Sequence, residues 1–463
     1  MFSMSSSSVF LFLLVLALIS FVNGRSYAIA SAGGNGKRLH SRPNYYGYFT
    51  ALWCTLPALA VAGIWSALEG GIVTSLALSS LPENLQNTDA ATLSLIANDI
   101  KNLATGNIVA QAPEPWLIKA AEDYKHFGQI SFYAMLAVVL TIFAGGFAWT
   151  RKQISPTLRA RNSVERIVLA ILMLCSGVAV LTTVGIVLSL IFETSRFFTK
   201  VPIADFLFGM EWSPQIALRK DQVGSTGLFG AIPLFSGTLL ISFIAMCVAA
   251  PIGLMAAIFM AEYAPSKIRG TVKPVLEILA GIPTVVYGFF AALTVAPFFR
   301  DAGESLGLLV SSESALVAGG VMGIMLIPFV SSLSDDVITA VPQSLREGSY
   351  GLGATQSETI RQVILPAALP GIVGSLLLAT SRAIGETMIV VMAAGLSANM
   401  TLNPLEAVTT VTVQIVTLLV GDQEFDSAKT LAAFALGLML FIVTLVLNIV
   451  ALMVVNRYRE QYD

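Results

Sequence analysis

Nine separate stretches of the sequence are long and apolar enough to cross a membrane. A transmembrane helix needs about 20 mainly apolar residues to span roughly 30 Å of hydrocarbon. Only 12% of the 463 residues are charged, against about 25% in soluble domains, so the chain cannot cover a soluble surface of this size. These observations exclude a soluble enzyme and predict an all-α polytopic membrane protein. The predicted spans are 4–23, 48–68, 130–149, 167–192, 234–261, 274–297, 313–333, 371–395 and 431–455.

The first stretch also fits the core of a signal peptide, because its strictly apolar part covers only residues 9–22. The segment before it has no Lys or Arg, whereas Arg25, Lys37, Arg38 and Arg42 follow it. A signal peptide has the reverse arrangement, with its basic residues first. We therefore expect an uncleaved span whose N-terminus lies outside.

The basic residues predict which loops face the cytoplasm, because cytoplasmic loops carry an excess of Lys and Arg. With the N-terminus outside, 16 of the 26 Lys and Arg residues fall in cytoplasmic segments and 9 in outside segments. The remaining one is Arg382, inside the eighth predicted span. The sequence thus predicts an outside N-terminus and a cytoplasmic C-terminus.

The basic stretch 151–166 divides the chain into two parts. The first part is a predicted membrane extension with three spans, and the second contains the other six. We expect four regions: the extension at 1–165 with an outside loop at 69–129, a span and outside loop at 166–233, a second membrane core at 234–455 and a tail at 456–463.

A loop at 334–370 is much longer than the other predicted cytoplasmic connections and is patterned for structure. Asp335, Asp336 and Ser344 can cap short helices. Ser344 also stands three residues before Glu347, which is the spacing of a capping box. These signals predict short helices within the loop.

The second half of this loop begins with a glycine turn at Gly351 and Gly353, and a helical pattern over 357–365 then ends at Pro366. Glycine at such positions permits a tight turn. We expect two short helices around this turn, either as a structured connector or as a docking element for a soluble partner.

Two charged residues lie inside the eighth predicted span. Arg382 and Glu386 are four residues apart, which places them on one face of a helix. A charge at mid-bilayer costs about 2.5–3.5 kcal/mol, so both side chains should face the protein interior. They can form a structural ion pair, or Arg382 can line the path of an oxyanion, because its planar guanidinium donates paired hydrogen bonds.

The sixth predicted span contains Glu277 near its cytoplasmic end, followed by Gly281 and Pro283. These two residues predict a kink or break in the helix. Broken helices in membrane proteins line cavities. Thr284 and Tyr287 can therefore offer hydroxyl groups to a passing anion, with packing as the alternative role.

Several kinds of site are not expected. The sequence lacks the GxxxxGK[ST] pattern of a phosphate-binding P-loop. Two histidines far apart and three cysteines in separate apolar runs predict neither a metal site nor a disulfide framework. We therefore expect no catalytic residue, no metal and no cofactor in this chain.

The segment EGSYGLGATQSETIRQVILP at 347–366 resembles the coupling-loop signature of ABC importer permeases. That signature is Glu-Ala-Ala, three residues, Gly, nine residues, Ile, one residue, Leu-Pro. Gly and Ser replace its two alanines here. Its other positions are occupied by Glu347, Gly353, Val363 (in place of Ile), Leu365 and Pro366.

The segments 257–265, 273–291 and 381–390 look like the PstC-type permease subunit of the bacterial phosphate ABC transporter. Residues 39–53 are similar to an extended form of the same subunit. The resemblance implies a type I ABC importer permease that carries inorganic phosphate across the bacterial inner membrane. It also implies that Arg382 and Glu386 line the substrate pathway and that the loop 334–370 transmits the movement of an ATPase.

The resemblance further implies three partners: a sister permease of PstA type, an ATPase homodimer of PstB type, and a periplasmic phosphate-binding protein of PstS type. ATP would then be hydrolysed by the partner, and this chain would not be an enzyme. Three alternatives stay open: an ABC permease for another oxyanion such as phosphonate or molybdate, an ion-coupled secondary transporter, and a structural membrane scaffold. A secondary transporter would be expected to have inverted repeats, and we find none in the sequence.

Overall fold

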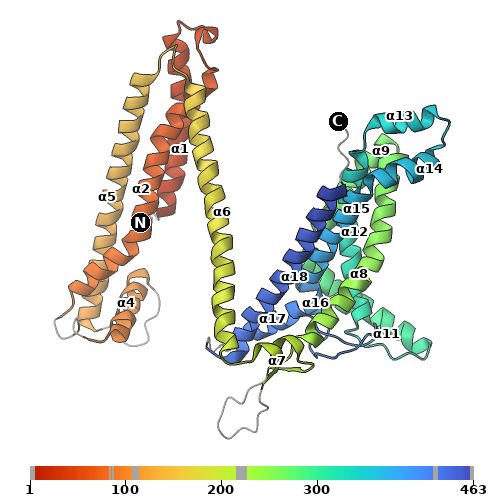
Figure 1. Cartoon of the computed structure of the whole chain (residues 1–463). Coiled ribbons are helices and arrows are strands. Elements are labelled where there is room, and N and C mark those ends of the chain that lie inside the picture. The colour runs from red at the N-terminus through yellow and green to blue at the C-terminus, as the bar shows by residue number, and fades with distance from the viewer. Residues whose placement is uncertain are drawn as a thin grey trace. The chain divides into compact units, whose positions relative to one another are not determined.

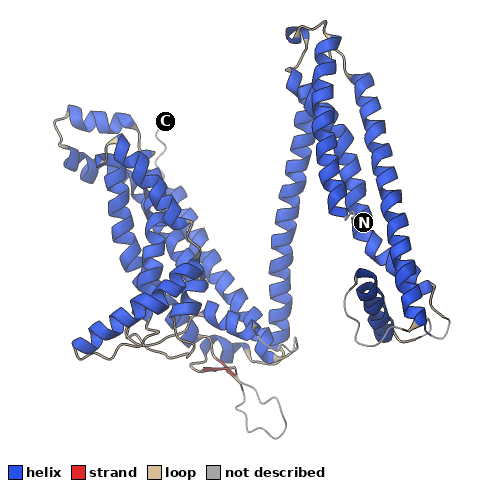
Figure 2. Cartoon of the chain, turned by 180° about the vertical axis from the view of Figure 1, so that it is seen from behind, coloured by secondary structure: helices blue, strands red, loops and turns tan. Residues whose placement is uncertain are grey.

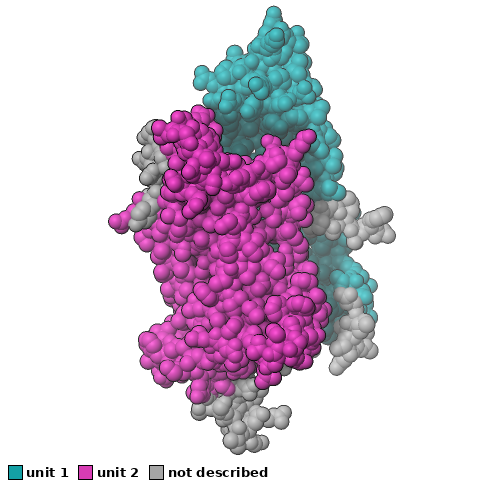
Figure 3. Space-filling model, turned by 90° about the vertical axis from the view of Figure 1, so that its right-hand side faces the viewer, with its two compact units in different colours: residues 1–180 teal, residues 181–463 magenta. Residues whose placement is uncertain are grey.

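The computed structural model consists almost entirely of helices (Figures 1 and 2). Within the residues that the structure describes, nine helices are long and apolar enough to cross a membrane. The fold therefore confirms the prediction of an all-α polytopic membrane protein. The chain divides into two compact units, residues 1–180 and residues 181–463 (Figure 3). The described residues are 6–82, 85, 88–106, 114–214, 227–420 and 426–458.

Three long helices form the first unit, with α1 packed on α2 and α2 packed on α5. Gly47 of α2 lets the first two helices approach closely, because a Cβ there would lie 2.7 Å from Cδ2 of Phe21. Small residues are common at contacts between membrane helices for this reason. The bounds are Ser6–Ser31 for α1, Pro43–Ser79 for α2 and Pro115–Gln153 for α5, with a 3-10 turn, η1, at Gly36–Arg38.

A short amphipathic helix, α4 (Ala90–Thr105), packs against α5. Its Ile96 and Ile100 are buried in a cluster with Leu117 of α5. Helix α5 begins 15 residues before the predicted span 130–149, because its first turns continue beyond the apolar stretch to meet α4.

Helix α6 (Ala160–Phe198) runs across the boundary between the two units and is followed by α7 (Ile203–Phe208). Strands β1 (Trp212–Ser213) and β2 (Leu228–Phe229) then pair antiparallel, with Trp212 opposite Phe229. The Trp212 indole nitrogen donates a hydrogen bond to Gln414 at 2.9 Å. This bond ties the hairpin to α17 (Val411–Leu419).

The second unit is built around α12 (Ala315–Thr339), which packs along α8 (Ile232–Ile258). Of the candidate spans α12 is the most buried, with 61% of its apolar window inside the fold. Glycines make this contact close, since Gly323 of α12 lies directly against Val248 of α8. Two further helices complete the bundle, α15 (Leu365–Gly385) and α18 (Ala428–Tyr458).

The sixth predicted span, 274–297, contains a break where it was expected, but its start was placed wrongly. Helix α9 (Ser266–Ala280) ends before Gly281, and α10 (Thr284–Phe290) begins after Pro283. The candidate span runs only from Thr284 to Ser305 through a π turn, η3 (Ala291–Val295), and α11 (Ala296–Ser305). Glu277 therefore lies in α9 and outside this span, because proline supplies no N–H to continue the α9 helix.

The eighth predicted span, 371–395, is interrupted at Glu386. Helix α15 ends at Gly385, and Glu386 has an extended backbone with ψ of 134°. The Glu386 carboxylate accepts a hydrogen bond from the backbone N–H of Met388 at 3.2 Å, where a new short helix, α16 (Met388–Ala393), starts. An acceptor at this place satisfies one of the free donors of the new helix.

Replacing Gly323 by Ala should lower the stability of the protein. The new Cβ would lie 2.7 Å from Cβ of Val248 and 2.8 Å from the carbonyl oxygen of Ala245, and such overpacking costs about 1–3 kcal/mol. Gly320→Ala is the matched control, because a Cβ there meets nothing within 4 Å. Thermal unfolding of the purified protein in detergent checks this, with a lower midpoint expected for Gly323→Ala alone. Equal midpoints would contradict the close contact between α8 and α12.

Candidate coupling surface and anion pathway

The predicted cytoplasmic loop folds into two short helices, α13 (Gln343–Gly351) and α14 (Gln356–Thr359), which lie beyond one end of the second unit's bundle (Figure 1). Gly353 stands between them with a φ of +88°, a conformation that favours glycine. The expectation of two helices around a glycine turn is therefore confirmed. Leu352, at the turn, is 92% exposed.

The helix caps predicted for this loop at Asp335, Asp336 and Ser344 were wrong. Asp335 and Asp336 do not cap short helices, because α12 continues past them to Thr339. Ser344 does not cap α13 either, since its N-cap is Pro342. The capping box lies further along the chain at the start of α14, as described next.

Thr355 and Glu358 form this capping box: Thr355 Oγ1 accepts from the Glu358 N–H, and the Glu358 carboxylate accepts from the Thr355 N–H at 2.8 Å. The helical pattern after it does not end at Pro366, because α14 continues through a π turn, η4 (Ile360–Ile364), into α15. Proline is tolerated there because it occupies the first turn of α15.

The residues of the coupling signature are distributed over this surface. Glu347 and Gly353 are exposed, whereas Val363 and Leu365 are half-buried where the loop rejoins the bundle, and Pro366 is exposed. Inside the loop, the hydroxyl groups of Ser349 and Thr359 lie 2.9 Å apart and connect α13 to α14.

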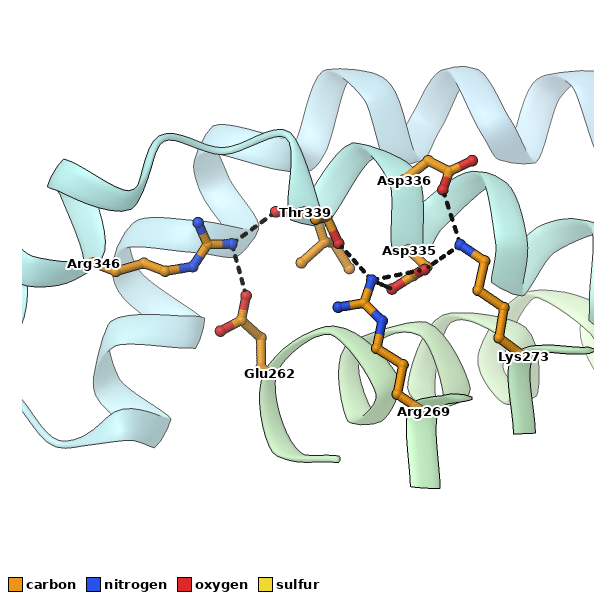
Figure 4. A network of polar contacts seen from close by, with 8 residues as sticks. Glu262, Arg269, Lys273, Asp335, Asp336, Thr339 and Arg346 are labelled. Carbon is orange, nitrogen blue, oxygen red and sulfur yellow. Dashed lines mark hydrogen bonds and ion pairs between the residues drawn. The ribbon is translucent and has the colours of Figure 1, made fainter. Parts of the chain in front are cut away.

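A buried carboxylate lies where α12 meets the loop (Figure 4). The side chain of Asp335 is 0% exposed, and it accepts hydrogen bonds from Arg269 at 3.1 Å and Lys273 at 2.9 Å, both from α9. Arg269 also donates to Thr339, and Lys273 reaches Asp336 at 3.2 Å. The hydrogen bond to Asp335 raises the pKa of Lys273, so this ammonium group stays charged at neutral pH.

A second ion pair fastens the loop to the end of α8. Arg346 of α13 donates to the Glu262 carboxylate at 2.9 Å, and the two side chains are 12% and 7% exposed. Arg346 also donates to the carbonyl oxygens of Ile338 and Val341. Glu262 belongs to the π turn η2 (Phe259–Tyr263), and its own carbonyl accepts from Gln356 at 2.7 Å. Both halves of the loop are thus bonded to one turn.

The predicted pair Arg382 and Glu386 does not share a helix face. Arg382 is exposed in the last turn of α15, with its guanidinium 5.5 Å from the ring centroid of Phe329. Glu386 lies beyond the helix end, where the backbone is extended. Among the described residues no ion pair joins them, because the interruption of the helix removes the spacing that would bring them together.

The other two predicted pathway residues lie on α10. Thr284 is its first residue, and the Tyr287 hydroxyl donates to the carbonyl oxygen of Leu279 at 3.0 Å, across the break from α9. Helix α10 packs on α16 at Gly288, where a Cβ would lie 2.8 Å from Cβ of Met392. The short helices that follow the two breaks are therefore in contact.

Comparison with known proteins connects these features to a transporter family. Residues 249–460 match a family described as binding-protein-dependent transport system inner membrane component, and residues 10–182 match one described as phosphate ATP-binding cassette transporter. The phosphate transport system permease protein PstC of Haemophilus influenzae is 34% identical over 250 residues, which is 50% of this chain and 78% of that protein. The chain belongs to the PstC family of ABC permeases.

Two further relatives match a similar share of this PstC-family chain. PstC 1 of Mycobacterium tuberculosis is 35% identical over 277 residues, covering 54% of this chain and 81% of that protein. The probable ABC transporter permease protein YqgH of Bacillus subtilis is 34% identical over 243 residues, covering 52% and 74%. The resemblance noted in the sequence is therefore confirmed, and the chain is a multi-pass transport subunit.

The two ion-pair groups at the base of the loop in this PstC-family chain, around Asp335 and around Glu262, were not predicted from the sequence. The partners of Asp335 lie more than 60 residues earlier in the chain, on α9. One signal was present in the sequence: Asp335 and Asp336 directly follow the predicted span 313–333, and three basic residues at 267, 269 and 273 directly precede the predicted span 274–297.

Removing one partner of the buried ion pair should destabilise the protein more than removing both. Arg346→Met leaves Glu262 charged and buried, which costs about 3–5 kcal/mol. Adding Glu262→Gln removes that charge, so the double variant should be more stable than Arg346→Met alone. Thermal unfolding of the two single variants and the double variant measures this coupling. If the stability losses of the two single variants simply add in the double variant, a direct ion pair between Arg346 and Glu262 is contradicted.

Proposed function

We propose that this chain is the permease subunit of an ATP-driven importer and forms, with a sister permease, the pathway that carries inorganic phosphate across the bacterial inner membrane. The observation that carries the proposal is the agreement between family and fold: a PstC-family chain presents the coupling signature on two helices that project from the end of its bundle. Such a subunit is not an enzyme and works with an ATPase and a binding protein.

We assign each partner to a surface of the second unit. We assign the PstB-type ATPase homodimer to the loop surface around Gly353 and Leu352. The turn between α13 and α14 lies there, and the exposed Leu352 side chain offers an apolar contact. We assign the PstS-type phosphate-binding protein to the opposite end, which carries α7 and α11 (Figure 1). A PstA-type permease completes the pathway.

This assignment also gives the orientation. The loop helices α13 and α14 lie at the same end of the second unit as the last turns of α18 (Figures 1 and 2). If the loop meets a cytoplasmic ATPase, the C-terminus is cytoplasmic, and nine spans then put the N-terminus outside. The excess of basic residues in the predicted cytoplasmic segments supports the same orientation.

We also propose that residues 1–165 are an extension of the permease core at 234–455, connected by the span and loop at 166–233. Two observations support this division. The two family matches cover separate parts of the chain, residues 10–182 and 249–460. The compact units likewise divide near residue 180.

We assign substrate contact to Arg382, with Thr284, Tyr287 and Glu386 nearby in the pathway. Arg382 has no hydrogen bond or ion pair among the described residues, so its guanidinium donors are available to an oxyanion. A guanidinium stays protonated and matches phosphate oxygens with paired donors. The contact with the Phe329 ring positions the guanidinium and leaves its positive charge unneutralised.

Arg382→Gln should abolish phosphate uptake while the protein stays inserted and assembled, because the amide cannot provide a permanent positive charge. Uptake of labelled phosphate by vesicles that contain the complete transporter measures this. Arg161→Gln is the matched control, since Arg161 is 62% exposed, pairs with Glu165 on α6 and lies in the first unit, outside the assigned pathway. Near-normal uptake by Arg382→Gln would exclude the pathway role.

Gly353→Asp should uncouple or detach the ATPase without removing the chain from the membrane. A side chain at a φ of +88° is strained, so the turn between α13 and α14 would change shape. Gly351→Asp adds the same charge at a residue without positive φ and should have a much smaller effect. ATPase co-purification and phosphate uptake are the measurements. Normal values of both for Gly353→Asp would show that the turn does not dock the ATPase.

A further inference from the structure

Helix α9 is held in the second unit by ion pairs from its first half and by a hydrogen bond at its last turn. None of its residues is buried, and Ile278 on its outer side is 70% exposed. A segment with few buried apolar contacts moves at low free-energy cost. The bonds at the ends of α9 therefore decide how it moves.

The first end is fixed to the base of the coupling loop. Arg269 and Lys273 both bond to the buried carboxylate of Asp335, and Arg269 also bonds to Thr339, the last residue of α12 (Figure 4). The helix that follows α12 in the chain is α13, and its Arg346 donates a hydrogen bond to the carbonyl oxygen of Ile338. A displacement of the loop thus acts directly on the residues that hold α9.

The other end of α9 is bonded to the proposed pathway. The Leu279 carbonyl accepts from the hydroxyl of Tyr287 at 3.0 Å, and Gly281 and Pro283 separate α9 from α10. The break allows the angle between the two helices to change, while the hydrogen bond keeps the end of α9 against α10.

A cavity of about 220 Å³ separates α9 from α12 beyond the ion pairs. The cavity is partly open and α9 has no buried residue, so this space leaves α9 room to approach α12. Phe329 forms part of its wall, and the guanidinium of Arg382 lies over the same ring. The cavity is lined by Met260, Lys273, Leu276, Glu277, Ala280, Pro328, Phe329 and Ser332.

We propose that α9 links the coupling loop to the substrate pathway and that Asp335 is the positioning residue on which this link depends. When the ATPase moves the loop, Asp335 carries Arg269 and Lys273 with it, and α9 tilts into the cavity. The tilt presses on Phe329 and shifts Arg382, and at the same time Tyr287 moves with the end of α9. This inference rests on the proposed function, because it takes the movement of the loop from the ATPase.

A thiol placed in the cavity reports this movement. In a chain whose three cysteines are replaced by serine, Ser332→Cys provides a single target for N-ethylmaleimide in the complete transporter. We expect labelling to be at least fivefold slower in the vanadate-trapped nucleotide state than without nucleotide. Asp335→Asn should abolish this difference, whereas Asp336→Asn should preserve it, because the Asp336 carboxylate is 66% exposed and, among the described residues, bonds to Lys273 alone. Equal labelling in the two states of the parent protein would overturn the proposal.

A second variant keeps the ion pairs intact and so covers the case in which Asp335→Asn does not fold. Ser332→Phe fills the cavity and should lower the maximal rate of phosphate uptake at least fivefold, with unchanged KM and ATPase co-purification. Ile278→Phe adds the same ring on the exposed side of α9 and should leave the rate unchanged. Equal rates for both variants would contradict the proposal. Absence of phosphate uptake by the parent protein would instead contradict the proposed function.

Discussion

A bilayer offers backbone groups no hydrogen-bonding partner, so a spanning segment stays helical except where it lines the protein interior. In the second unit the chain leaves the helical conformation directly beside two candidate spans, at Gly281–Pro283 before Thr284–Ser305 and at Glu386–Thr387 after Gln356–Gly385. The short helices that follow the two breaks, α10 and α16, pack on each other. The breaks therefore meet in one region, and the residues assigned to the substrate pathway lie on or next to these helices.

Charged residues also connect the helices of this unit. The two groups of ion pairs at the base of the loop make different connections: the group around Asp335 connects α12 to α9, and the pair Arg346–Glu262 connects the loop to the end of α8. Buried ion pairs contribute little net stability, but breaking one is costly. Ion pairs of this kind fit a segment that moves while it stays attached to its neighbours. They fix the geometry of the contact and bury little apolar surface.

The sequence predicted much of this structure where the signals were local. The nine spans followed from apolar length, and the turn at Gly353 followed from glycine spacing. Arg382 and Glu386 were expected on one face because the four-residue rule assumes an unbroken helix, and no strong breaker such as proline marks the interruption at Glu386. The environment of Asp335 could not be predicted locally, because its partners come from a helix that packs against it only in the folded unit.

The central claim is that this chain carries phosphate in a transporter driven by ATP. The most direct measurement is the uptake of labelled phosphate into vesicles that contain this chain, with and without the sister permease, the ATPase and the binding protein. We expect uptake only when the partners and ATP are all present. Uptake that proceeds without ATP, or no uptake of phosphate by the complete assembly, would contradict it.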